Sequence, residues 1–137
     1  MIRRACHMLA LLGALSAGCG GASDTDAVRA TIIGYLDALA SGDGGRACDQ
    51  LTGEQVRAVV SIAIEQVPEL GALTCAEAVA SLAEQLGADE KATLRDAEVF
   101  DVTIDGETAT ASIGTGVPIA LRRADGRWLI SSGIGSP

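Results

Sequence analysis

The spacing of the apolar residues changes once along this chain, from the period of a helix to the period of a strand. Val28, Ile32 and Leu36 recur at the spacing of one helix face, and further apolar stripes of this kind continue as far as Leu86. From Phe100 onwards apolar and polar residues alternate, as they do in a half-buried strand. Helices followed by strands predict an α+β fold, with N-terminal helices packed on one face of an antiparallel C-terminal sheet.

Capping and turn residues divide the chain into these elements. The expected helix starts are Asp24 or Asp26, Asp43, Thr52 with Gln55, and Thr74 with Glu77, and the expected helix ends are Gly42, Leu51, Pro68 and Gly87. Asp105-Gly106 and Asp125-Gly126 are predicted to be two-residue hairpin turns between neighbouring strands. No helix is predicted between Gly87 and the first strand.

The core of this fold has to be built almost without aromatic rings. Apolar residues make up 48% of the 137 residues, but aromatic residues only 2%. Ala, Val, Ile and Leu must therefore supply most of the buried surface of a single domain, with Trp128 as its largest anchor. The formal net charge of −8 argues against nucleic acid as a partner, because like charges repel.

The N-terminus has the layout of an export signal. Arg3 and Arg4 precede an apolar run, residues 5–15, that is too short to span a bilayer as a helix. The run from Ser16 to Cys19 (Ser-Ala-Gly-Cys) then resembles the lipobox of bacterial lipoproteins. This resemblance implies cleavage before Cys19 and a diacylglycerol on its thiol, so that a lipid anchor on Cys19 would be the contact with the membrane.

The expected organisation follows from this processing. Residues 1–18 would be the signal peptide, 19–26 the lipidated Cys with a polar tether, and 27–137 a single α+β domain at the extracytoplasmic face of the cell membrane. Loss of Arg3 and Arg4 would shift the net charge from −8 to about −10. Cleavage by the ordinary peptidase, after Ser16 or Ala22, is the alternative and would give a secreted protein.

The four cysteines divide by position. Cys6 lies in the signal and Cys19 is the acylation candidate, which leaves Cys48 and Cys75 as an even pair in an oxidising compartment. We expect them to form a disulfide that closes a loop of about 28 residues. No metal site and no cofactor are expected, because the only His, His7, also lies in the signal.

Two segments of the domain resemble a known superfamily. They are the run from Val28 to Asp43 (Val-Arg-Ala-Thr-Ile-Ile-Gly-Tyr-Leu-Asp-Ala-Leu-Ala-Ser-Gly-Asp) and the closing Asp-Gly-Arg-Trp of 125–128. They resemble the nuclear-transport-factor-two-like, cystatin-like superfamily, and in particular small actinobacterial envelope lipoproteins that carry a Cys pair. The resemblance implies a curved antiparallel sheet wrapped on a long helix, a cystatin-like cone that often leaves an apolar pocket. Tyr35, Phe100 and Trp128 are the pocket candidates.

No catalytic residues are predicted. Tyr35 resembles, by its position in the first helix, the oxyanion-holding Tyr of ketosteroid isomerases, which also need an Asp base in the same pocket. The available carboxylates, Asp37, Asp101 and Asp105, are expected on the outer helix face, away from the core and in a turn. We therefore interpret Tyr35 as a residue that packs at the edge of the core.

Three functional hypotheses remain at this stage. The first is a non-catalytic, lipid-anchored envelope protein that binds a small apolar ligand in a closed sheet pocket. The second is an interaction module that docks on an envelope protein, or on a second copy as a homodimer, through the sheet face. The third is a small acid–base isomerase or dehydratase with its pocket near Tyr35. Binding or interaction is preferred to catalysis.

Overall fold

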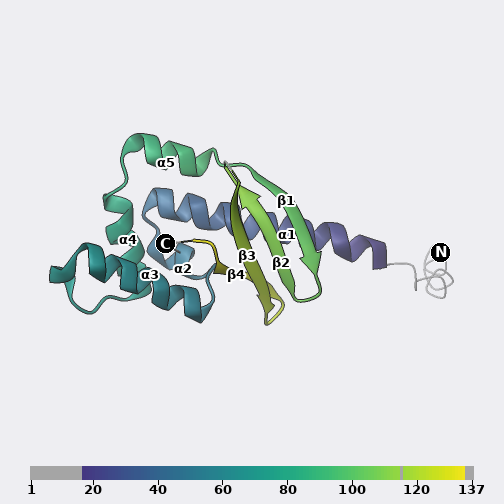
Figure 1. Cartoon of the computed structure of the whole chain (residues 1–137), viewed down its shortest axis with the longest axis horizontal. Coiled ribbons are helices and arrows are strands. Elements are labelled where there is room, and N and C mark those ends of the chain that lie inside the picture. The colour runs from purple at the N-terminus through teal and green to yellow at the C-terminus, as the bar shows by residue number, and fades with distance from the viewer. Residues whose placement is uncertain (1–16, 115, 135–137) are drawn as a thin grey trace, which may run out of the picture.

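The computed structural model describes residues 17–114 and 116–134, with side chains placed from Asp24 onwards. The helices are α1 (Ala17–Ser41), α2 (Gly44–Cys48), α3 (Gly53–Gln66), α4 (Cys75–Glu84) and α5 (Ala88–Arg95), and a 3-10 turn, η3 (Pro68–Leu70), follows α3 (Figure 1). The strands are β1 (Val99–Asp105), β2 (Thr108–Ile113), β3 (Val117–Ala124) and β4 (Arg127–Ser132). Helices precede strands, as predicted, whereas most of the expected signal peptide (1–18) lies outside the described residues.

The strands form one antiparallel sheet in the order β1-β2-β3-β4. Asp125-Gly126 joins β3 to β4 as predicted, and its φ angles of 51° and 75° are those that a tight hairpin turn requires. The first turn lies one residue later than expected. Because Asp105 pairs with Thr108, the two turn residues are Gly106 and Glu107, and Gly106 supplies the positive φ of 59°.

A bulge in β1 sends Phe100 to the outer face of the sheet. Phe100 pairs with Ser112, and further along the strand Ile104 pairs with the buried Ala109, so β1 holds one more residue than β2 between these pairs. Asp101, in the bulge, has a φ of 52°, which Asp adopts more readily than most residues. Paired residues share a face, so Phe100 does not share the face of Ile104. The alternation predicted for these two residues is therefore wrong.

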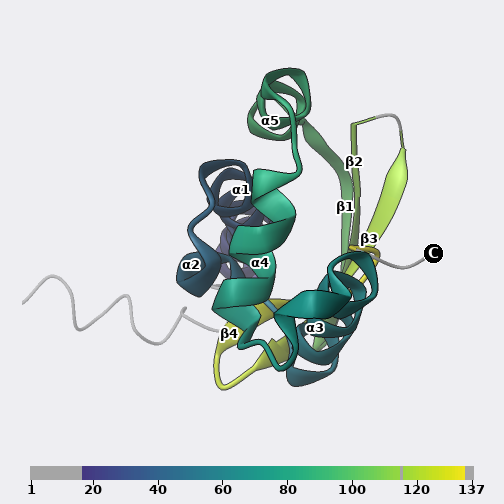
Figure 2. The same ribbon diagram turned by 90° about the vertical axis from the view of Figure 1, so that its left-hand side faces the viewer.

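The helices cover one face of the sheet. The strands cross in front of α1 in Figure 1, and Figure 2 shows α1, α2 and α4 on one side of β1, β2 and β3. The largest fully buried side chains lie between these two layers: Val28, Ile32, Val79, Ile119, Leu121 and Ile130. Trp128 is buried among them. The predicted α+β architecture, helices on one face of a curved antiparallel sheet, is confirmed and is consistent with a cystatin-like fold.

Helix α1 is longer than predicted and is fastened to the sheet near its start. It begins at Ala17, so Asp24 lies inside the helix and residues 20–26, expected to be a tether, are helical. The Asp24 carboxylate pairs with Arg123 of β3, whose guanidinium lies 4.7 Å from the centre of the Trp128 ring. This stack holds α1 against β3 and β4 through an ion pair and a cation–π contact.

The predicted caps act at three helix starts. Asp43 caps α2 and Thr52 caps α3, each by accepting a backbone N–H. Thr74 and Glu77 form the full reciprocal capping box at the start of α4. Gln55 departs from the prediction, because its amide donates a hydrogen bond to the carbonyl of Ile134 near the C-terminus.

Helix α5 is the element that the sequence pattern did not predict. Gly87 was expected to end the fourth helix, but α4 ends at Glu84 and Gly87 is the N-cap of α5. The helix has few apolar residues, and none of its residues is fully buried. Its Leu94 packs against the core, and Arg95 donates a hydrogen bond to the carbonyl of Ala40 on α1 at 3.4 Å. Contacts with α1 therefore stabilise a segment whose own apolar pattern is weak.

Helices α2 and α4 are joined at their closest point. The expected disulfide between Cys48 and Cys75 is present, with an S–S distance of 2.04 Å and a Cα–Cα distance of 6.2 Å. Beside it, Gly44 of α2 lies so close to the backbone of Ala76 that a Cβ at Gly44 would be 2.0 Å from the Ala76 carbonyl oxygen. The crossing therefore requires glycine at this position.

Candidate functional site

An apolar pocket of about 240 Å³ lies among three helices and the C-terminal segment. Its lining comes from α1 (Tyr35, Leu39), α3 (Val59, Ile62, Gln66), the end of α4 and the residues after it (Leu82, Gln85, Leu86), and Ile134. Figure 2 shows α4 running between α1 and α3. The pocket is thus enclosed mainly by helices, whereas the sequence had led us to expect a pocket in the sheet.

The exposure of the lining side chains distinguishes the floor of this pocket from its mouth. Tyr35 and Val59 are buried, whereas Leu39 and Ile62 are half-buried. Gln66 and Gln85 are exposed and mark the mouth. The site is therefore an open-mouthed pocket with an apolar interior and polar amides at its rim.

Tyr35 is the polar residue among the buried residues described at the pocket floor. The residue is only 3% exposed, and no hydrogen bond joins its hydroxyl to any other described residue. Burial raises the pKa of Tyr35 from its ordinary value of 10.0 to about 12, so the phenol is neutral at physiological pH. A hydroxyl without a partner among the described residues has a hydrogen bond available for another molecule.

The lining that the structure describes carries no formal charge. Its nine residues comprise six aliphatic side chains, two amides and the neutral Tyr35. An ion entering such a site would lose hydration without gaining an opposite charge. The pocket is therefore chemically suited to a neutral molecule.

A buried amide holds the C-terminal segment against the pocket. Gln55 on α3 is 5% exposed, and its side chain donates to the carbonyl of Ile134, whose own side chain lines the pocket. Gly133 approaches the backbone of Pro118 so closely that a Cβ there would be 2.3 Å from the Pro118 carbonyl oxygen. These two contacts fix the position from which Ile134 reaches the pocket.

The structure does not bring the three predicted pocket residues together. Tyr35 lines the pocket, but Phe100 lies on the outer sheet face and Trp128 lies under Arg123. The indole Nε1 of Trp128 is buried without a hydrogen-bond partner among the described residues. The backbone carbonyl of Trp128 also accepts a hydrogen bond from the Thr31 hydroxyl, at 3.2 Å. The contacts of Trp128 therefore link α1 to β4.

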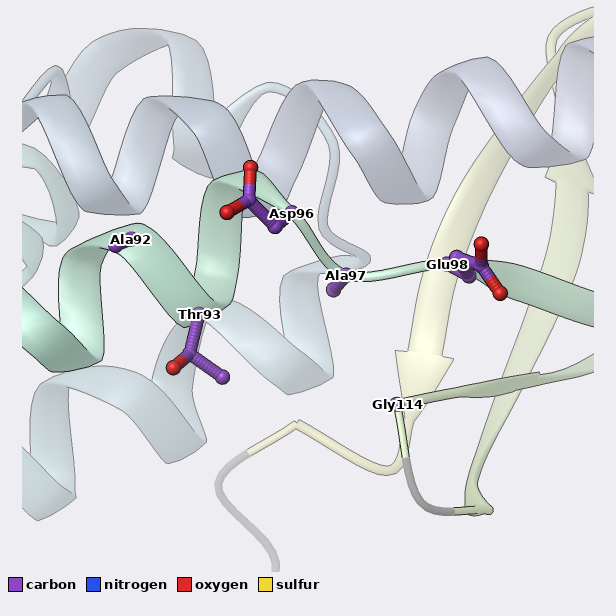
Figure 3. A pocket seen from close by; sticks show the side chains of 6 residues that line it. All are labelled: Ala92, Thr93, Asp96, Ala97, Glu98 and Gly114. Atoms are coloured by element: carbon purple, nitrogen blue, oxygen red, sulfur yellow. The ribbon is translucent and has the colours of Figure 1, made fainter.

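A second, larger hollow of about 470 Å³ lies between the end of α5 and the sheet. It is lined by Ala92, Thr93, Asp96, Ala97, Glu98 and Gly114. Figure 3 shows that the two carboxylates lie apart and that Thr93 points away from Asp96, so the polar groups do not converge on one point. Its small and exposed lining offers little apolar area to a ligand.

The carboxylates considered as partners of Tyr35 lie elsewhere. Asp37 pairs with Arg46, Asp101 lies in the exposed β1 bulge, and Asp105 ends β1 at the hairpin. None of them lines the Tyr35 pocket. Within residues 17–114 and 116–134, no cluster of three or more His, Cys, Asp or Glu side chains is placed to hold a metal ion.

Cys19 belongs to the first turns of α1, but its side chain is outside the described part of the chain. Acylation there therefore stays a prediction. Among the helices that the structure describes, none combines the length and the apolar character needed to cross a bilayer.

Several pocket residues were not recognisable from the sequence. Val59, Leu82 and Leu86 belong to the predicted apolar stripes, but Ile62, Gln66, Gln85 and Ile134 do not. A stripe marks the face that a helix buries, whereas the pocket lies at the margins of three such faces. No periodic signal distinguishes these margin positions from ordinary surface.

No protein-family model, curated protein or solved structure matches this chain. The function has therefore to be inferred from the geometry and chemistry of the pocket.

Proposed function

We propose that this chain is an exported, lipid-anchored envelope protein whose domain binds a small apolar ligand without catalysis. The binding site would be the pocket between α1, α3 and the end of α4. The observation that carries the proposal is that Tyr35, a buried residue whose hydroxyl has no hydrogen-bond partner among the described residues, lines a pocket that is apolar apart from the two amides at its rim. Pockets with an apolar lining and a few placed polar groups are the usual form of small-molecule sites.

Two features favour binding over the acid–base alternative. General acid–base chemistry needs a titratable group within hydrogen-bond reach of the substrate, and none of the described residues that line this pocket carries a carboxylate. Tyr35 keeps its proton up to a pKa of about 12, which makes it a poor proton shuttle near neutral pH.

The outer sheet face gives less support to the interaction alternative. Apart from Phe100 and Leu129, many of its residues are small or hydroxylated, including Thr103, Thr110 and Ser112. A docking surface would need a larger continuous apolar patch. The homodimer and the protein partner are therefore outcomes that the experiment must be able to report.

The membrane part of the proposal comes from the N-terminal sequence. The lipobox-like run that ends at Cys19 would place the acyl anchor at the start of the processed α1, a few residues before the Asp24 that pairs with Arg123. The domain would then be held close to the membrane surface and not on a long flexible tether.

Native mass spectrometry of the full chain, purified gently from the membranes of producing cells, tests these claims together. We expect a mass that corresponds to cleavage before Cys19, acylation and an intact disulfide, together with a stoichiometric small-molecule adduct. Cys19→Ala should lose the acyl mass. An unmodified mass for the wild-type protein would contradict the anchor.

A matched pair of variants tests whether the ligand binds in this pocket. Ile62→Trp would fill the pocket, whereas Ile64→Trp changes a half-buried Ile on the same helix that does not line it. The adduct should survive in Ile64→Trp and disappear in Ile62→Trp. A wild-type spectrum with a dimer or a co-purifying protein, and without an adduct, would instead favour the interaction module.

A further inference from the structure

We infer that the ligand of the Tyr35 pocket is a neutral amphiphile of about eight non-hydrogen atoms, whose single uncharged polar group bonds to the Tyr35 hydroxyl. The inference rests on the proposed function, because it specifies the chemistry of the same pocket. Three properties of the site carry it: the charge of its lining, the state of the Tyr35 hydroxyl and the volume.

The charge of the lining excludes ionic ligands. None of the nine lining residues carries a formal charge, so neither a carboxylate nor an ammonium group would find a counter-ion inside. The whole chain has a net charge of −8, which further disfavours the approach of anions. A fatty acid would therefore have to leave its carboxylate at the mouth, beside the amides of Gln66 and Gln85.

The Tyr35 hydroxyl sets a requirement for one polar atom at the inner end of the ligand. Tyr35 is a buried residue with a neutral phenol, and its hydroxyl has no partner among the described residues. The hydroxyl is not one of the fully buried side-chain atoms, so water can reach it. Filling the pocket with a pure hydrocarbon would strip water from this hydroxyl and leave it unpaired. A hydroxyl or carbonyl group on the ligand would satisfy it, and one such hydrogen bond corresponds to about a tenfold gain in affinity.

The volume sets the size of the ligand. A pocket of about 240 Å³ holds on the order of eight water molecules, at roughly 30 Å³ each. This is smaller than the usual site for a drug-sized molecule, which begins near 300 Å³. A chain of about seven carbons with one polar end matches the space, whereas a full-length membrane acyl chain would extend beyond it.

Isothermal titration of the full chain with three probes of equal chain length tests the inference. The probes are heptanol, heptane and heptanoate, measured at neutral pH with the wild-type protein and with Tyr35→Phe. We expect heptanol to bind the wild type at least about tenfold more tightly than either of the others. In Tyr35→Phe the affinity for heptanol should fall to that for heptane, while the affinity for heptane is retained.

The outcomes separate this inference from the proposed function. Equal binding of heptanol and heptane by the wild type, or preferred binding of heptanoate, would overturn the inference and leave a ligand pocket in place. Failure of all three probes to bind would overturn both. Retained binding of heptane by Tyr35→Phe shows that the variant is folded, and Ile64→Trp serves as the control with an unchanged pocket.

Discussion

Replacing Gly44 by Ala should destabilise the protein, whereas the same replacement at Gly45 should not. Both residues lie in the first turn of α2, and helix propensity alone would favour Ala at both positions by about 0.5 to 1 kcal/mol. The tertiary surroundings differ. A Cβ at Gly44 would lie 2.0 Å from the carbonyl oxygen of Ala76 and 2.7 Å from its carbonyl carbon, whereas a Cβ at Gly45 meets only Asp43, at 4.0 Å.

The clash at Gly44 cannot be relieved cheaply. The atoms in the way belong to the backbone of α4, and the neighbouring Cys75 is covalently bound to Cys48 of α2. Restoring an ordinary contact distance requires the helices to separate by on the order of 1 Å. Overpacking of this kind typically costs 1 to 3 kcal/mol, so we expect Gly44→Ala to lose about 2 kcal/mol and Gly45→Ala to stay within about 0.5 kcal/mol of the wild type or exceed it.

Urea unfolding, followed by the fluorescence of the single Trp, measures both variants against the wild type. Thermal unfolding gives a second measure: at roughly 4 °C per kcal/mol for a domain of this size, the melting temperature of Gly44→Ala should fall by about 8 °C. Equal unfolding midpoints for Gly44→Ala and Gly45→Ala would refute the close approach of α2 to α4.

Three further perturbations test separate parts of the structure. Replacing Cys48 and Cys75 together by Ala should lower the free energy of unfolding by about 3.5 kcal/mol, because the reopened loop, whose ends are 27 positions apart, gains entropy in the unfolded chain; a loss below about 1 kcal/mol in urea unfolding would contradict this. Arg123→Met should change the fluorescence of Trp128 and lower stability by on the order of 1 kcal/mol, and an unchanged emission spectrum would argue against the stacked guanidinium. Tyr35 has a folded pKa raised from 10.0 to about 12, so its neutral form contributes stability that is complete below pH 10 and is lost as the pH rises towards 12. Since the chain has one Tyr, its tyrosinate absorbance reports this pKa directly, and a midpoint near 10 in the folded protein would contradict the buried position.

The chain's own local signals were enough for the order and class of the elements. The capping residues Asp43, Thr52 and Thr74 each act where their position predicted, because an N-cap depends on backbone groups only a few residues away. The Asp125-Gly126 turn also follows from local conformational preference. Helix α5 escaped prediction because its stability comes from contacts with α1 and not from its own apolar pattern.

The pocket could not be derived in this way. Of the three predicted pocket residues, only Tyr35 lines it, and Phe100 was misplaced because a single bulge moved it to the other face of the sheet. Export, acylation of Cys19 and the choice among binding, docking and catalysis stay predictions.

The sequence alone determined an α+β domain in which a disulfide joins two helices. The signals were the apolar period, the caps, the turns and the pairing of Cys48 with Cys75. These features depend on neighbours along the chain or on simple counting. The tertiary structure alone decided that Tyr35, Val59, Leu82 and Ile134 meet at one pocket, and that the Tyr35 hydroxyl has no partner there among the described residues. The physical reason is that a cavity is the space left between several helix faces after they pack. The size of that space is set by the packing of the whole core and not by any one segment.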